Sequence, residues 1–125
     1  MRVFILLSAI ATILISSSDC SPKNDTRTKY KGRLEIKGIC LNYTIKLLEG
    51  KIDTSLIATE WTDESSGKTY TNVFGLADPC RFPKTLNQGD EFYFAIDTVK
   101  PEDCIMCQAY YPTPLRRLII KVLDK

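Results

Sequence analysis

The sequence contains no histidine, and this single absence removes several common kinds of catalytic and metal-binding site. Serine and cysteine hydrolases of the triad type depend on an imidazole as general base, so both mechanisms are excluded. Zinc or copper centres with histidine ligands and haem held by a histidine are excluded for the same reason. Since no other catalytic group of residues is recognisable, we expect a protein that is not an enzyme and that carries no metal or cofactor.

A strong excess of charge is also lacking, because 17 basic and 15 acidic residues leave a net charge of +2. A charge so close to zero produces no field that would attract nucleic acid or an anionic membrane surface. We therefore expect no nucleic-acid partner. The expected partner is instead a protein or a glycan ligand.

No segment keeps a 3.6-residue period, and the best helical candidate is a single turn near Ile52 to Leu56. Short segments of alternating or β-branched and aromatic residues recur instead, and the polar residues 63–68 predict a hairpin. The expected strands include residues 34–36, 43–47, 57–62, 69–76, 91–97 and 118–123. The predicted fold class is all-β, a small antiparallel sandwich or barrel of about six or seven strands, stabilised by disulfides.

The chain has an uncharged run of thirteen residues, from Val3 to Ile15, which is too short to span a bilayer comfortably. This run follows Arg2 and precedes three serines, which is the pattern of an export signal. Residues 1–19 are therefore predicted to be a signal peptide. Residues 20–31 are predicted to be a polar tether, because they cannot bury enough apolar surface to order themselves. Residues 32–125 remain for a single β domain.

Cys20 follows the predicted signal directly and is preceded by Ser17, Ser18 and Asp19. This arrangement resembles a bacterial lipoprotein signal, in which a branched residue and two small residues precede a lipid-modified cysteine. Ser18 fits that pattern, and Asp19 departs from it. The order of signal, cysteine, tether and small β domain is similar to small lipoproteins of Gram-negative bacteria. The resemblance implies a lipid on Cys20 that anchors the protein to a membrane, in the periplasm or at the outer membrane.

The other four cysteines, Cys40, Cys80, Cys104 and Cys107, are the disulfide candidates. An exported protein meets an oxidising compartment, which favours disulfides over a four-cysteine metal site. Four cysteines allow three pairings. Cys40–Cys80 with Cys104–Cys107 is possible, whereas bonding Cys40 and Cys80 to different members of the Cys104-x-x-Cys107 pair would link more of the chain. A redox motif would need Cys104 at the start of a helix, and Pro101 and the neighbouring residues favour an extended segment instead.

Aromatic residues supply the candidate ligand surface, for which Trp61, Tyr110 and Tyr111 are the residues of interest. The alternative for these side chains is a place in the core, where aromatic residues of strands commonly pack. Residues 104–111 and 118–123 are expected to close the chain as a last hairpin. Because neighbouring residues on a strand face opposite ways, only one of the two tyrosines could then line a ligand surface.

The sequence thus predicts a non-catalytic binding or structural module of the cell envelope, anchored by a lipid on Cys20. One alternative is an extracytoplasmic thiol–disulfide protein that uses Cys104 and Cys107. A second alternative is a secreted glycoprotein, because Asn24-Asp25-Thr26 and Asn42-Tyr43-Thr44 match the glycosylation acceptor pattern.

Overall fold

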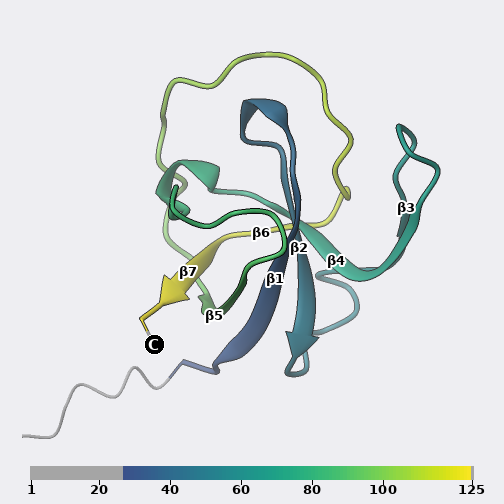
Figure 1. Cartoon of the computed structure of the whole chain (residues 1–125). Helices are drawn as coiled ribbons and strands as arrows, with labels where there is room; N and C mark the ends of the chain where they lie inside the picture. The colour runs from purple at the N-terminus through teal and green to yellow at the C-terminus, as the bar shows by residue number, and fades with distance from the viewer. Residues whose placement is uncertain (1–26, 125) are drawn as a thin grey trace, which may run out of the picture.

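The computed structural model describes residues 27–124, so the predicted signal peptide, Cys20 and the first part of the predicted tether lie outside the described residues. Strands dominate this part of the chain (Figure 1). The elements are β1 (Tyr30–Lys37), the 3-10 helix η1 (Ile39–Leu41), β2 (Tyr43–Glu49), β3 (Ala58–Thr62), β4 (Thr69–Leu76), the 3-10 helix η2 (Pro79–Arg81), β5 (Glu91–Ile96), β6 (Arg117–Leu118) and β7 (Ile120–Leu123). The predicted all-β class is confirmed.

Two local expectations differ from the structure. The helical turn expected near Ile52 to Leu56 is a simple turn, in which the Leu56 amide donates to the Asp53 carbonyl at 2.9 Å. Strand β1 begins at Tyr30, two residues before the expected start of the domain at Gly32. Tyr30 belongs to the domain because its ring stacks on the buried ring of Phe94, with 5.5 Å between the ring centroids.

The strands form one curled sheet in the order β3-β4-β2-β1-β5-β7. In this order β5 returns to the free side of β1, and β5, β1, β2 and β4 therefore form a Greek key. The C-terminal segment then spans the curled sheet, because β6 pairs in parallel with β4, the neighbour of the end strand β3, and β7 pairs antiparallel with β5. The link between β6 and β4 has only two residue pairs, so the result is a partly open barrel rather than a closed one.

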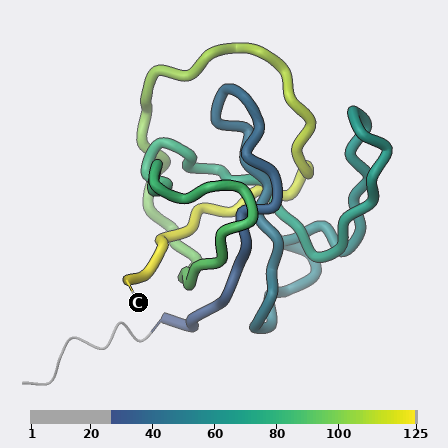
Figure 2. The backbone as a smooth tube through the Cα atoms, in the orientation of Figure 1, coloured from purple at the N-terminus to yellow at the C-terminus, as the bar shows by residue number. Residues whose placement is uncertain are grey.

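The expected last hairpin between residues 104–111 and 118–123 is wrong. Residues 98–116 contain no strand and arch over the end of the barrel (Figure 2). Pro101, Pro112 and Pro114 have no amide hydrogen to donate to a ladder, which disfavours regular pairing along this segment. Strand β7 pairs with β5 instead, from Tyr93↔Leu123 to Ile96↔Ile120.

The core fills the inside of the curled sheet, and aromatic rings make up its centre. The Phe94 ring is fully buried, with the rings of Phe74 and Phe92 at centroid distances of 5.8 and 6.0 Å. Gly32 leaves room for this ring, because a Cβ at that position would lie 2.9 Å from the Phe94 Cε1 atom. The buried cluster consists of Leu34, Ile45, Ile52, Ile57, Phe74, Leu76, Phe82, Phe92, Phe94 and Leu118.

The end of the arching segment is packed against the sheet. The Tyr111 ring lies so close to Gly38 that a Cβ there would be 2.6 Å from the ring, and the Pro114 carbonyl would be 3.2 Å from a Cβ at Gly75. Pro114 is fully buried. Thr44, which pairs with Gly75 in the sheet, is also fully buried, and its hydroxyl has no partner among the described residues. Residues 111–114 therefore form a second, smaller packed layer.

The β3–β4 hairpin extends away from the barrel (Figure 1). Its tip is organised by Asp63, which is 3% exposed. One carboxylate oxygen of Asp63 accepts hydrogen bonds from the amide and hydroxyl of Ser65 at 2.9 and 2.7 Å, and the other accepts from the Ser66 hydroxyl at 3.0 Å. Burial raises the pKa of Asp63, but the hydrogen bonds from Ser65 and Ser66 outweigh it and hold the pKa below its ordinary value.

Substitution Asp63→Ala is expected to lower the free energy of unfolding by about 1–3 kcal/mol near neutral pH, because three turn donors lose their acceptor. Since the pKa of Asp63 is lower in the folded protein, its contribution is present above the pKa of the unfolded carboxyl group and is lost as the pH falls through the folded value. Urea denaturation from about pH 7 down to about pH 2 should show the two proteins converging. A constant difference across that range, or an equal loss in the exposed control Asp103→Ala, would contradict this role.

Candidate functional site

Two disulfides join three connections at one end of the barrel. Cys40 is bonded to Cys107, with 5.0 Å between their Cα atoms, and Cys80 is bonded to Cys104, with 5.8 Å. The connections are the β1–β2 turn that contains η1, the β4–β5 segment that contains η2, and residues 98–116 between β5 and β6. The predicted disulfides are confirmed, in a pairing that links separate segments. Because Cys104 and Cys107 have different partners, they do not form the internal bond that a redox Cys-x-x-Cys pair requires.

A buried carboxylate reinforces the contact between the two connections that the Cys80–Cys104 disulfide links. Asp78 is 3% exposed, and its Oδ2 lies 2.6 Å from the Nε of Arg81 within η2. Its Oδ1 accepts a hydrogen bond of 3.2 Å from the amide of Glu102, at the start of the arching segment. The Arg81 guanidinium also donates to the carbonyl of Lys100. The chain on both sides of the Cys80–Cys104 bond is therefore held by charge-assisted hydrogen bonds as well.

The β1–β2 turn contains two neighbouring residues in the left-handed backbone region. Cys40 has φ 57° and Leu41 has φ 60°, which is costly for residues other than glycine. The bond to Cys107 and a 2.9 Å hydrogen bond from the Asn42 side-chain amide to the Ile39 carbonyl hold the turn in this conformation. Such strained residues persist only where the surroundings fix them, and they concentrate at functional sites.

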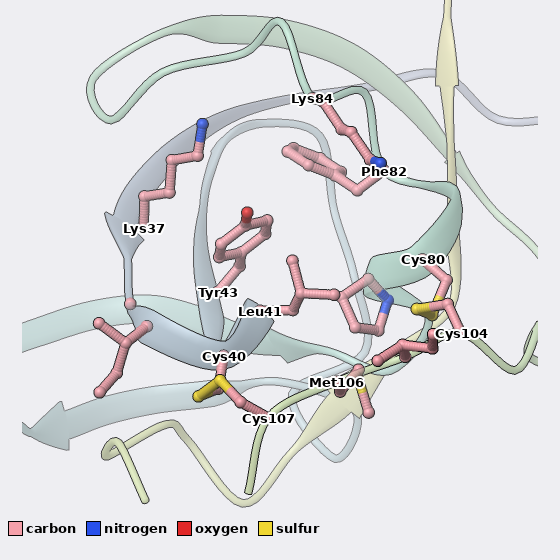
Figure 3. A pocket seen from close by; sticks show the side chains of 14 residues that line it. Lys37, Cys40, Leu41, Tyr43, Cys80, Phe82, Lys84, Cys104, Met106 and Cys107 are labelled. Atoms are coloured by element: carbon pink, nitrogen blue, oxygen red, sulfur yellow. A yellow bond between two sulfur atoms is a disulfide. The ribbon is translucent and has the colours of Figure 1, made fainter. Parts of the chain in front are cut away.

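These three connections surround a pocket of about 730 Å³ (Figure 3). Its wall is mostly apolar and includes both disulfides together with the side chains of Ile39, Leu41, Phe82, Ile105 and Met106. The volume falls within the range of roughly 300–1,000 Å³ that is common for small-molecule sites. The pocket is thus large enough for a ligand, and its walls come from segments that are far apart in the sequence.

Three polar side chains complete the lining. The Lys37 ammonium donates to the Leu86 carbonyl at 2.9 Å. Lys84 is exposed and makes no ion pair with another residue of the 27–124 range. The Tyr43 ring packs edge-on against Phe82, with 5.8 Å between centroids, and its hydroxyl has no hydrogen-bond partner in the part of the chain that the structure describes.

The titratable side chains of the pocket's described lining, apart from its cysteines, are two lysines and one tyrosine. Its described lining includes no carboxylate, no imidazole and no serine or threonine hydroxyl, and its four cysteines are all disulfide-bonded. Within residues 27–124, no three His, Cys, Asp or Glu side chains are placed to hold a metal ion together. None of the helices in the described range is long and apolar enough to cross a membrane.

The three aromatic residues that the sequence singled out lie outside this pocket. Trp61 stacks on Tyr70 in the β3–β4 hairpin, with 5.8 Å between their centroids. Tyr110 is 77% exposed and donates its hydroxyl to Glu64, and this bond raises the pKa of Tyr110. Tyr111 packs over Gly38. The pocket residues Ile105 and Met106 were missed, although two apolar residues between two cysteines in a proline-flanked segment are a detectable signal.

A second pocket of about 580 Å³ lies beside β5 and β7 and has a different character. Its charged lining carries both signs, with Lys29 and Lys31 facing the same space as Glu91 and Asp124. The Lys29 ammonium already lies over the ring of Tyr93, 4.1 Å from its centroid. The first pocket differs because all of its described charged side chains are cations.

Comparisons of the chain with protein-family models, with curated proteins and with solved structures find no match.

Proposed function

We propose that the protein is a non-catalytic binding module of the extracytoplasmic space, and that its ligand occupies the pocket between the three disulfide-linked connections. Two disulfides support a location outside the reducing cytoplasm, because such bonds persist in oxidising compartments. The observation that carries the proposal is an apolar pocket of about 730 Å³ whose walls are fixed by covalent bonds. Walls that are fixed before binding reduce the entropy that a ligand must overcome.

Exposed apolar side chains at the mouth of the pocket support this proposal. Ile39 is 58% exposed, Met106 is 50% exposed, and the Ile105 side chain is fully in solvent. All three line the same pocket, and they come from two connections that the Cys40–Cys107 bond holds together. Exposed large apolar residues that gather at one place mark binding surfaces, whereas isolated ones are ordinary.

The position of the pocket in the fold agrees with this role. The pocket is formed by loops that a strand scaffold positions, and binding residues are disproportionately found on such loops. Figure 1 shows that β1 begins at the opposite end of the barrel from η1. We further propose that Cys20 carries a lipid, as in small lipoproteins of Gram-negative bacteria, and that the tether enters β1 from the membrane side. The pocket would then face away from the anchoring membrane.

The geometry bears on the thiol–disulfide alternative and on the acceptor pattern at Asn42, whereas the pattern at Asn24 lies outside the described residues. A thiol–disulfide exchange centre would need Cys104 and Cys107 to bond to each other, and each is bonded elsewhere. For a glycan on Asn42, the side-chain amide would have to be free, but in the fold it donates to the Ile39 carbonyl, and Thr44 of the same acceptor pattern is fully buried.

Two exposed residues of the arching segment provide a matched test. Ile105 and Leu115 are both essentially fully exposed, but only Ile105 lines the pocket. We expect a set of small aromatic and aliphatic fragments to shift the NMR methyl signals of Ile39, Ile105 and Met106, while the exposed Leu56 stays unchanged. Substitution Ile105→Ser should weaken binding of the best fragment by about tenfold, because an apolar contact is lost, and Leu115→Ser should leave it within about twofold.

The proposal fails if no fragment perturbs the pocket methyls, or if Ile105→Ser and Leu115→Ser weaken binding equally. Turnover of a fragment by the purified protein would contradict the non-catalytic assignment.

A further inference from the structure

The polar groups of the pocket are gathered on one side. Figure 3 shows the nitrogen atoms of Lys37 and Lys84 and the hydroxyl of Tyr43 toward one side, and the disulfides and Met106 toward the other. Lys37 comes from the end of β1, Tyr43 from the start of β2, and Lys84 from the β4–β5 connection. Two strands and one connection thus bring hydrogen-bond donors to the same side of the pocket.

Each of these donors has capacity left for a ligand. The Lys37 ammonium donates one hydrogen bond, to the Leu86 carbonyl, and has two further protons. Lys84 has no acidic partner among the described residues. The Tyr43 hydroxyl has no hydrogen-bond partner among them. Since the described lining contains two cations and no carboxylate, the charge that complements this side of the pocket is negative.

The opposite side of the pocket offers apolar contact. Met106 and the two disulfides present sulfur and carbon atoms, and Ile39 and Ile105 extend this surface to the mouth. A peptide would need polar partners along its whole backbone, whereas the side-chain donors of this pocket are at one end. A ligand with one charged head and one apolar chain matches this division.

We propose that the pocket binds an amphipathic carboxylate, with the carboxylate between Lys37, Tyr43 and Lys84 and the aliphatic chain against Ile105 and Met106. This inference rests on the binding function proposed above and specifies its ligand. The ammonium groups and the phenol donate to the carboxylate oxygens, and such charge-assisted hydrogen bonds are the stronger class. The aliphatic chain contributes affinity in proportion to the apolar surface that it buries.

The test compares three ligands that share an eight-carbon chain: octanoate, 1-octanol and octyltrimethylammonium. Calorimetric titration of the oxidised protein should show octanoate binding about tenfold or more tightly than either of the others. Shortening octanoate to hexanoate should weaken binding by about tenfold, because two methylene groups leave the apolar wall. Raising the salt concentration should weaken octanoate binding and leave octanol binding nearly unchanged.

Matched variants locate the head group. Lys84→Gln removes an exposed charge and is expected to weaken octanoate binding by about five- to tenfold, while octanol binding is unchanged. Tyr43→Phe should weaken octanoate binding by a few fold, because one neutral hydrogen bond is lost. Lys51→Gln makes the same change of net charge at an exposed position outside the pocket and should have an effect of less than about twofold.

The outcomes distinguish an error in the assigned ligand from an error in the assigned binding site. If octanol binds as tightly as octanoate, or if Lys84→Gln and Lys51→Gln have equal effects, the carboxylate assignment is overturned and the binding pocket stands. The carboxylate assignment is also overturned if octanoate shifts the NMR signals of the second pocket, beside β5 and β7, instead of those of Ile105 and Met106. If none of the three ligands shifts the methyls of Ile39, Ile105 and Met106, and the fragment set does not do so either, the proposed function falls with it.

Discussion

Replacing both Cys40 and Cys107 by alanine is expected to lower the free energy of unfolding by about 4 kcal/mol. The bond closes a loop across 67 residues, and its loss returns that conformational freedom to the unfolded chain. In a domain of this size, whose whole stability is expected to be roughly 5–15 kcal/mol, the change is large. Urea denaturation of the oxidised protein and of the double variant, without reductant, measures it directly.

The second disulfide supplies the control for this prediction. Cys80 and Cys104 are separated by 24 residues, so the corresponding double alanine variant should lose somewhat less, about 3.5 kcal/mol. A variant that lacks Cys40, Cys80, Cys104 and Cys107 should respond no further to reductant. Equal midpoints for the wild type with and without reductant would show that the bonds do not stabilise the fold, and would remove the main support for an extracytoplasmic protein.

Substitution Phe94→Ala is expected to cost about 3–5 kcal/mol, because it opens a cavity at the centre of the aromatic cluster. The ring is fully buried and lies between Tyr30, Phe74 and Phe92, at centroid distances of 5.5, 5.8 and 6.0 Å. These distances are in the range where aromatic pairs contribute beyond the area that they bury. Denaturation monitored by near-ultraviolet circular dichroism follows the loss of this packing.

A conservative change at the same position tests the packing argument. Phe94→Leu keeps an apolar side chain of intermediate size and should cost clearly less than Phe94→Ala. It also gives a measurable value if the alanine variant is already unfolded at room temperature. If both substitutions cost the same small amount, the ring is not tightly packed and the assignment of the core centre is wrong.

The strands could be predicted from the sequence because their signal is local. Phe92 and Phe94 lie on either side of the half-buried Tyr93, and both side chains point into the core of the folded sheet. The β3–β4 hairpin could be predicted for the same reason, since Gly67 and its polar neighbours lie directly between two strand-like segments. The partners of each strand beyond its hairpin depend on contacts between distant residues, and no local pattern encodes them.

The site was less accessible to sequence reasoning. An apolar pair such as Ile105-Met106 is typical of a strand, and the expected final hairpin followed from that pattern. In the fold, Cys104 and Cys107 are bonded to two other connections, and the segment between them becomes an exposed wall of the pocket. Tyr43 begins β2 and Lys84 lies in the β4–β5 connection, so only the folded chain brings them to the same pocket, and neither residue carries a signal of its own.

The nested disulfides also have a consequence for biosynthesis. In the still unfolded chain, Cys104 and Cys107 are only three positions apart, whereas their final partners are 24 and 67 positions away. Encounter is most frequent between thiols that are close in sequence, so the first oxidation event favours a pairing that the mature molecule does not contain. Wherever that early bond forms, it must be exchanged before the native pairs are complete, and such exchange takes seconds to hours according to the oxidant and the isomerase present.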